Sequence, residues 1–265
     1  MYTNMNKEIN FYWGNEEMSW LRYMTLVSFI KHNPEWKVNL YLDKSVELSK
    51  VWATPEVQDF FVSGRNNYLS KIEELGVEIK NCNGVTESAK TPAQKSDLFK
   101  WHLLATEGGF YSDMDIVFLK SIDKIYDISK EYEAGLTYTS YFSIGFMFSS
   151  GNNKIFERIY LSSINGDQKD YQGYGVKSVY KVYPTIKDMG DKVFNIPMKW
   201  FYYNDSDHVD NIFLKNNYDE VKNNSYGLHW YAGHPLAQEF NNQVNKENCG
   251  RFETTIGKAL VFNGQ

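Results

Sequence analysis

The stretch EGGFYSDMD, residues 107–115, is the part of the sequence that indicates the fold most directly. A Gly-Gly pair favours the end of a helix, an aromatic pair follows, and two aspartates then occupy positions 113 and 115 with one residue between them. The apolar run IVFL at 116–119 resumes a strand directly after them. Two carboxylates near one strand end can reach a hard divalent cation such as Mg²⁺ or Mn²⁺, directly or through water.

A helix is predicted immediately before this stretch. Thr91 can cap it, Pro92 suits its first position, and Gln94 completes a capping box. We expect this helix to run to about Glu107, where Gly108-Gly109 ends it.

The N-terminal part of the chain predicts a β-α-β unit. Residues 9–13 alternate as a strand that ends at Gly14, and Ser19 can cap a helix running to about His32. Asn33-Pro34 stops that helix, and residues 38–42 alternate as a second strand. This order begins an α/β sheet.

The rest of the chain adds further elements to the same sheet. We expect helices from residue 54, over 66–75 with Gly76 as the end, and over 154–163. Short strands are predicted over 77–79, 134–138 and 144–148. Residues 165–224 give no clear pattern, and no domain boundary stands out, so we expect one domain over 1–265.

Composition excludes several classes of protein. The net charge of −5 argues against nonspecific nucleic-acid binding, which depends on Lys and Arg neutralising phosphates. Two cysteines without a CxxC pair argue against a zinc cluster. No apolar run approaches the roughly 18 residues that span a bilayer. We therefore expect a cytoplasmic protein without a transmembrane segment, and peripheral membrane contact stays open.

The aspartate pair alone is a weak signal. With 15 Asp among 265 residues, about one D-x-D is expected by chance, and a second one does occur at Asp205-Ser206-Asp207. Context separates the two. The first follows a capped helix and precedes an apolar strand, whereas the second lies in a polar stretch that resembles a surface loop.

A longer pattern carries more information. SDLFK at 96–100 followed by EGGFYSDMD resembles the sugar-binding region of glycosyltransferase family 32, which includes capsular polysaccharide and yeast mannosyl transferases. Glucosylating clostridial toxins are more distant relatives. FYWG at 11–14, Asn33-Pro34 with the strand after it, and LHWYAG at 228–233 extend the resemblance.

The resemblance implies a GT-A fold, a Rossmann-like nucleotide-binding mixed sheet flanked by helices. A nucleotide-sugar half would cover about 1–150 and an acceptor side about 150–265. It further implies a retaining, metal-dependent transferase that moves a sugar from a nucleoside diphosphate sugar to an acceptor hydroxyl of a glycan or polysaccharide. UDP is our choice of nucleotide, and GDP stays open.

Two other classes remain as alternatives. A carbohydrate-binding or inactive transferase relative would use the aromatic residues to bind glycan without turnover. A metal-dependent phosphohydrolase also uses a D-x-D, but its first Asp usually follows an apolar strand near the N-terminus and acts as a nucleophile. Here the pair lies in mid-chain, after Tyr111-Ser112.

The resemblance also assigns roles to individual residues. Asp115 would coordinate Mn²⁺ or Mg²⁺ directly, Asp113 would reach the metal through water, and His229 would be the third ligand, with His234 as a weaker alternative. An imidazole ligand favours Mn²⁺. The alternative interpretation is structural: His229 would be a core histidine hydrogen-bonded to the backbone, and one of the two aspartates would only cap a turn.

Asp97 and Lys100 lie three apart on the predicted helix and so share a face. Asp97 would accept hydrogen bonds from donor-sugar hydroxyls, and Lys100 would contact the sugar or the diphosphate. The family usually has Arg at the second position, and Lys cannot form the same planar fork. The alternative is a surface ion pair.

The catalytic candidates are therefore Asp97, Lys100, Asp113 and Asp115. Trp13 is a candidate to stack on the base, or else a core residue, and Tyr111 is either core or donor-adjacent. The full set of candidate donor-binding residues is Phe11, Tyr12, Trp13, Asp97, Lys100, Gly109, Tyr111, Asp113, Met114 and Asp115.

Overall fold

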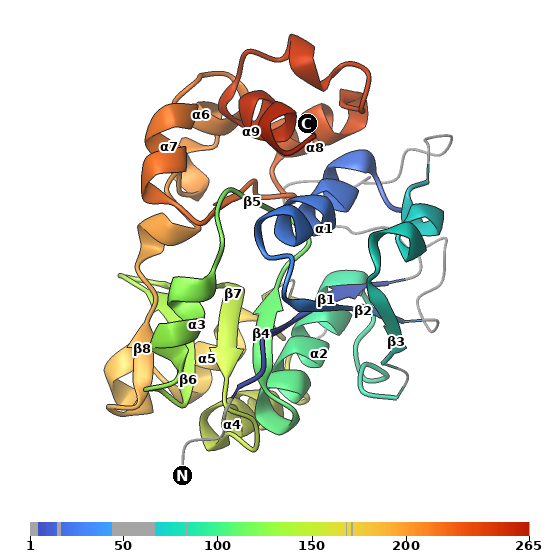
Figure 1. The fold of residues 1–265 in the computed structure, drawn as a ribbon. Helices are drawn as coiled ribbons and strands as arrows, with labels where there is room; N and C mark the ends of the chain where they lie inside the picture. Colours follow the sequence, from blue (N-terminus) through green and yellow to red (C-terminus); the bar gives the residue numbers. More distant parts are fainter. Residues whose placement is uncertain are drawn as a thin grey trace.

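The computed structural model describes residues 5–14, 17–43, 67–82, 84–167, 169–170 and 172–264. Its main element is a seven-stranded mixed sheet in the order β3-β2-β1-β4-β7-β6-β8, and a separate sheet pairs β5 with β9 (Figure 1). The strands are β1 Glu8–Trp13, β2 Lys37–Leu42, β3 Glu78–Asn81, β4 Gly109–Ser112, β5 Ile116–Phe118, β6 Ala134–Tyr138, β7 Phe142–Ser149, β8 Val193–Asn195 and β9 Gly227–His229.

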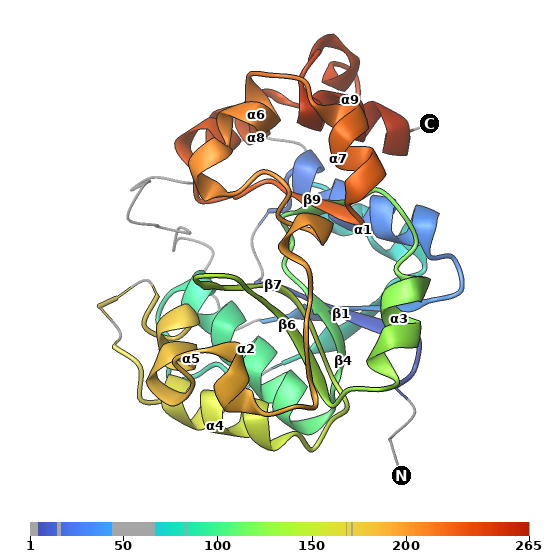
Figure 2. The ribbon, with the colours of Figure 1, turned by 90° about the vertical axis from the view of Figure 1, so that its left-hand side faces the viewer.

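Helices flank this sheet. They are α1 Trp20–His32, α2 Pro92–Thr106, α3 Asp123–Ser129, α4 Lys154–Ser163, α5 Val176–Val182, α6 Asp210–Phe213, α7 Tyr218–Asn224, α8 Pro235–Gln243 and α9 Thr255–Gly264. Helices α2, α4 and α5 lie on one side of the sheet and α3 on the other (Figure 2). None of the helices in the described ranges has the length and apolar character that a bilayer crossing requires.

The predicted β-α-β unit is confirmed. Strands β1 and β2 pair in parallel from Glu8↔Lys37 to Trp13↔Leu42. The Ser19 side chain accepts from the Arg22 amide and caps α1, and Asn33 closes the helix. The capping box of Thr91 and Gln94 is also present at the start of α2. Local sequence therefore determines where these helices begin and end.

One predicted helix is wrong. Residues 69–75 form two short 3₁₀ helices, Leu69–Lys71 and Glu73–Leu75, where one helix was expected. Neither has a side-chain cap, and a helix this short is marginal without one. Gly76 does end the segment, in the left-handed conformation with φ of 71°. The helix expected from residue 54 lies outside the described residues.

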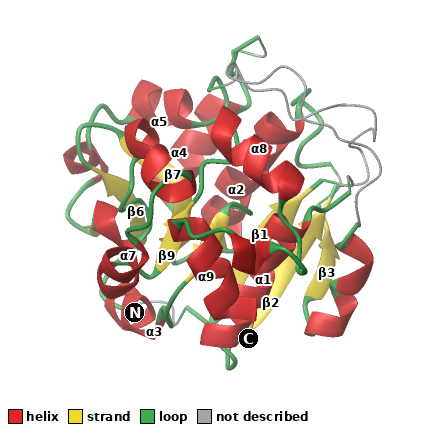
Figure 3. Cartoon of the chain, turned by 90° about the horizontal axis from the view of Figure 1, so that it is seen from above, coloured by secondary structure: helices red, strands yellow, loops and turns green. Residues whose placement is uncertain are grey.

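Each face of the sheet has its own apolar core. Phe11 packs with Phe29 of α1 on one face, and Tyr12 packs with Phe99 of α2 on the other, as alternation along a strand requires. Helices α6 to α9 gather with β9 at one end of the sheet (Figures 1 and 2). Seen from that end, α9 lies in front of the strands (Figure 3).

Candidate active site

The D-x-D segment lies where the chain passes from one sheet to the other. Strand β4 belongs to the main sheet, whereas β5 pairs with β9 in the small one. The Asp113 amide donates to the Gly145 carbonyl of β7 at 2.7 Å, and the Trp230 amide donates to the Asp115 carbonyl at 2.9 Å. Residues 113–115 therefore connect the two sheets, with a turn at 114–115.

Asp115 is buried against the segment that follows β9. Its Oδ2 accepts from the Ala232 amide at 3.0 Å, and its Oδ1 lies 3.2 Å from His229 Nε2. The Oδ1 contact lacks hydrogen-bond alignment, so this buried atom has no hydrogen-bond partner among the described residues. Burial opposes ionisation of Asp115, but the charges of His229 and Arg22 and the hydrogen bonds hold its pKa below the usual range.

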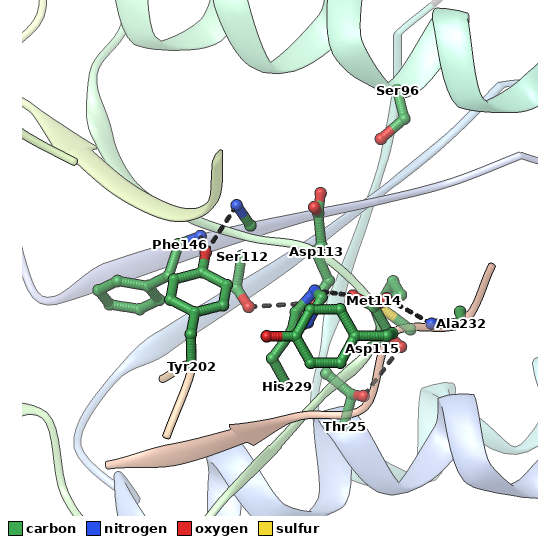
Figure 4. A network of polar contacts seen from close by, with 12 residues as sticks. Thr25, Ser96, Ser112, Asp113, Met114, Asp115, Phe146, Tyr202, His229 and Ala232 are labelled. Carbon is green, nitrogen blue, oxygen red and sulfur yellow. Dashed lines mark hydrogen bonds and ion pairs between the residues drawn. The ribbon is translucent and has the colours of Figure 1, made fainter. Parts of the chain in front are cut away.

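Two tyrosine rings fix the His229 side chain. The ring centroids of Tyr202 and Tyr231 lie 5.1 Å and 4.3 Å from that of His229. The Tyr202 hydroxyl accepts from the Gly145 amide at 2.8 Å and so ties this group to β7 (Figure 4). Burial raises the pKa of both tyrosines, which keeps the hydroxyls protonated.

Tyr231 adopts a backbone conformation that is costly for a residue with a side chain. Its φ is 50°, in the left-handed region, and its hydroxyl donates to the Asn204 carbonyl at 2.9 Å. Such conformations cost on the order of 1–3 kcal/mol and concentrate at functional sites. Tyr231 lies two residues after His229, and its conformation brings the next amide, that of Ala232, onto Asp115.

Asp113 has a different set of partners. Lys100 Nζ lies 3.1 Å from Asp113 Oδ1 and 3.0 Å from Asp97 Oδ1, and the Tyr111 hydroxyl donates to Asp113 Oδ1 at 3.0 Å. Figure 4 shows the Asp113 carboxylate pointing away from Asp115, toward the side of Ser96. Burial opposes the charge on Lys100, yet Asp113 and Asp97 raise its pKa well above the usual value. The Asp97–Lys100 pair is thus buried, whereas the alternative was a surface ion pair.

A glycine makes room for Asp97. A Cβ atom at Gly175 would lie 2.6 Å from Asp97 Oδ2, so the segment before α5 can approach the carboxylate only because residue 175 has no side chain. Burial raises the pKa of Asp97, and Lys100 opposes that rise.

These groups share one cavity of about 430 Å³. It brings together six of the expected site residues, namely Asp97, Lys100, Asp113, Asp115, His229 and His234. The other residues that line it are Tyr141, Ser143, Ile144, Gly145, Gln172, Tyr202, Ser206, Val209, Tyr231, Ala232 and Gly233. None of these others was selected from the sequence as a site residue, although Tyr231, Ala232 and Gly233 lie in the LHWYAG segment and Ser206 lies in the second D-x-D. The rest follow no motif.

The remaining candidates lie away from this cavity. Phe11, Trp13 and Met114 are buried in the core on the α1 face, and none of them lines the cavity. The Tyr12 hydroxyl donates to Asp43 Oδ2 at 3.0 Å. Tyr111 is fully buried on the α2 face, where its hydroxyl donates to Asp113 and its ring centroid lies 5.3 Å from Lys100 Nζ.

Gly109 is a correction to the expected donor contacts. Gly109 begins β4, whereas Asp113 follows the end of that strand. The two residues therefore lie at opposite ends of β4. It lines a separate pocket of about 190 Å³ with Glu8 and Asn10. Its neighbour Gly108 has φ of 77°, and a Cβ there would meet the Gly151 amide nitrogen at 2.3 Å. The glycine pair thus ends α2 and allows close packing.

The second D-x-D forms an exposed 3₁₀ turn, Ser206–His208, and its Ser206 lines the cavity, where a surface loop was expected. Asp205 accepts from the Asp207 amide at 3.1 Å and lies 2.6 Å from His208 Nδ1. Across the described ranges, no three or more His, Cys, Asp and Glu side chains are grouped to hold a metal ion. At the first D-x-D, Asp113 faces Lys100 and only Asp115 and His229 meet.

Comparisons with known proteins agree with the predicted resemblance. Residues 21–132 match the model described as "Glycosyltransferase sugar-binding region containing DXD motif". The glycosyltransferase GlyE of Streptococcus pneumoniae TIGR4 has a TM-score of 0.55 at 11% identity, over 98% of this chain and 60% of that chain. The WbbM bifunctional glycosyltransferase has a TM-score of 0.53 at 10% identity, over 98% of this chain and 50% of that chain.

This chain therefore spans 50–60% of the length of these two solved structures. At such identities the likeness establishes the fold, which is the GT-A glycosyltransferase fold that the sequence predicted. No curated protein sequence matches the chain. The resemblance to D-x-D glycosyltransferases is confirmed by the family match and the fold together.

Proposed function

We propose that this protein is a metal-dependent, retaining glycosyltransferase with a nucleoside diphosphate sugar as donor, UDP being our choice of nucleotide. The acceptor is a hydroxyl of a glycan or polysaccharide. One observation carries the proposal: a single cavity joins the buried Asp115–His229 pair to the Asp97–Lys100–Asp113 group. The match of residues 21–132 to a D-x-D sugar-binding region supports the same class.

The residues present fit a divalent cation. Asp115 Oδ1 is a buried oxygen without a hydrogen-bond partner among the described residues, and His229 Nε2 lies 3.2 Å from it. A Cβ at Gly145 would lie 3.3 Å from Asp113 Oδ2 and 3.4 Å from His229 Cδ2, so the missing side chain leaves space between these groups. Asp115 and His229 would hold Mn²⁺ or Mg²⁺ directly, Asp113 would reach it through water, and the imidazole favours Mn²⁺. The metal would stabilise charge on the departing nucleoside diphosphate.

The chain's own residues bind and orient the donor. Asp97 accepts hydrogen bonds from sugar hydroxyls, and Lys100 keeps a positive charge beside the diphosphate because two carboxylates stabilise it. Fixed charges of this kind, aimed where charge develops, supply most of the catalysis. In a same-face reaction the leaving phosphate takes the acceptor proton, so the mechanism needs no dedicated base.

The acceptor side of the proposed single domain covers about 150–265. Gln172, Tyr202 and Tyr231 line the cavity from this side, and Tyr141 lies at its edge with 39% of its surface exposed. Aromatic rings can stack on the faces of sugars. We assign Tyr141 and Tyr231 to the side on which the acceptor enters, whereas Tyr202 is buried against His229.

The test is a screen of sugar nucleotides with Mn²⁺ that records thermal shift and donor hydrolysis. We expect one sugar nucleotide to stabilise the protein and to be hydrolysed slowly, and EDTA to abolish both responses. Product analysis by NMR should show a retained anomeric centre. Hydrolysis that persists undiminished in EDTA would refute the metal role, and an inverted product would refute the retaining mechanism.

A further inference from the structure

A buried arginine lies beside the Asp115 site without lining the cavity. Arg22, in the first turn of α1, is 7% exposed, and its guanidinium carbon lies 5.4 Å from the Trp13 ring and 4.8 Å from the Trp230 ring. Both indoles are almost fully buried. A cation between two indoles is attracted by both ring faces, and the attraction is strongest where water is excluded.

Trp230 links this arginine to the proposed metal site. Its amide donates to the Asp115 carbonyl at 2.9 Å. The preceding residue, His229, lies 3.2 Å from Asp115, and the Ala232 amide two residues later donates to the same carboxylate at 3.0 Å. A shift of the Trp230 ring would therefore move both groups that contact the Asp115 carboxylate.

The same face of α1 also contacts the D-x-D backbone. Thr25 lies three residues after Arg22, and its hydroxyl donates to the Met114 carbonyl at 3.0 Å (Figure 4). Residues three apart share one face of a helix. This face of α1 thus holds residues 113–115 through Thr25 and the segment 229–232 through Arg22.

We propose that Arg22 is a positioning residue of the donor site, which fixes the segment 229–232 against Asp115 and so sets the geometry in which metal and diphosphate bind. This inference rests on the proposed function. A positioning role predicts a change in metal affinity, whereas a purely stabilising role predicts a change in Tm alone. Groups that orient metal ligands change metal affinity by about 10–100-fold when they are replaced.

Two substitutions at this position separate charge from packing. Arg22→Met keeps an apolar stem but removes the cation, whereas Arg22→Lys keeps a cation. Lys222→Met is the matched control, because Lys222 lies 3.9 Å from the Phe262 ring centroid in a cation–π contact between α7 and α9. None of the residues in that contact lines the cavity.

The measurement is the Kd of Mn²⁺ in the presence of UDP by calorimetry, with thermal unfolding of each variant. We expect Arg22→Met to raise the Kd about tenfold or more, Arg22→Lys to raise it less, and Lys222→Met to leave it unchanged while lowering the Tm. If Arg22→Met is too unstable to purify, the Arg22→Lys and Lys222→Met pair carries the same comparison.

The outcomes distinguish this inference from the proposed function. If the wild-type protein binds no Mn²⁺ in the presence of UDP, the proposed donor site fails and the positioning role fails with it. If the wild type binds and the Arg22 variants bind equally well, with only the Tm lowered, the positioning role alone is overturned.

Discussion

Asp113 and Asp115 stand two positions apart in the chain, yet different parts of the molecule hold them. The partners of Asp113 are local, because Lys100 is 13 residues away and Tyr111 only two. The partners of Asp115 are distant in the sequence, since Ala232 is 117 residues away and His229 stands three residues before Ala232. The D-x-D therefore connects two groups of side chains. The contacts of Asp113 are with residues near it in the sequence, and those of Asp115 are with residues that only folding brings close.

The two carboxylates also differ in what they can offer a ligand. A buried ammonium already neutralises Asp113, whereas Asp115 keeps one buried oxygen without a hydrogen-bond partner within the described residues. A cation can bind that oxygen without displacing a hydrogen-bond donor. This contrast favours Asp115 as the direct ligand and Asp113 as the indirect one, and substitutions in four parts of the molecule test it.

Replacing Asp115 should have the largest effect. In Asp115→Asn the side chain keeps its shape but loses the negative charge that would face the metal. We expect Mn²⁺-dependent donor hydrolysis to fall by about 10²–10³-fold, the range found when one electrostatic group is removed from an active site. The check is the hydrolysis rate at saturating Mn²⁺ with Tm as the folding control. A rate within twofold of wild type would contradict the assignment.

Replacing Lys100 should act first on stability. Lys100→Met would leave Asp97 and Asp113 facing each other without a cation, and breaking a buried ion pair from one side costs about 3–5 kcal/mol. Urea denaturation measures this change in the free energy of unfolding. Lys100→Arg is the control, because it keeps the charge and should lose less. Equal stability of Lys100→Met and wild type would mean that the local group contributes nothing.

Adding one methyl group at Gly145 should affect binding more than folding. The Cβ of Gly145→Ala would lie 3.0 Å from the Tyr202 hydroxyl and 3.3 Å from Asp113 Oδ2, in the space between the two carboxylate environments. A displacement of about 1 Å in a site can cost about 100-fold in rate. We expect a loss of tenfold or more in UDP affinity with Mn²⁺ by calorimetry. Unchanged affinity would show that the cation binds elsewhere.

The second D-x-D should respond least. In Asp205→Asn and Asp207→Asn the changes lie in an exposed turn, where Asp205 caps the Asp207 amide. Exposed groups of this kind contribute about 0–1 kcal/mol. We expect donor hydrolysis within twofold of wild type. A loss as large as that of Asp115→Asn would move the metal site to this turn and would reverse the comparison.

The features that were predicted correctly depend on short-range chemistry. The cap at Ser19, the capping box at Thr91 and the bounds of α4 at 154–163 involve residues within four positions of each other. The Asp97–Lys100 contact follows from the same helical spacing. Its burial was not predicted, because the covering segment at Gly175 lies 75 residues further along the chain.

The features that were missed depend on contacts between distant segments. Tyr202 enters the site because its hydroxyl accepts from the amides of Gly145 and Phe146, more than 50 residues earlier. Nothing in the sequence around residue 202 marks that contact. Gly109 was placed among the donor-binding residues, although the length of the four-residue strand β4 separates it from Asp113 in space.

The sequence by itself determined the N-terminal β-α-β unit, the start of α2, the bounds of α4 and the helical spacing of Asp97 and Lys100. Its resemblance to a known family implied the GT-A fold and singled out the first D-x-D. Caps, periodicity and helical spacing are local, so they can be read along the chain. Only the tertiary structure decided that Asp115 meets His229 and Ala232, and that Arg22 lies between Trp13 and Trp230. Those contacts arise when separate elements bury their apolar faces together, and no local pattern specifies which side chains then meet.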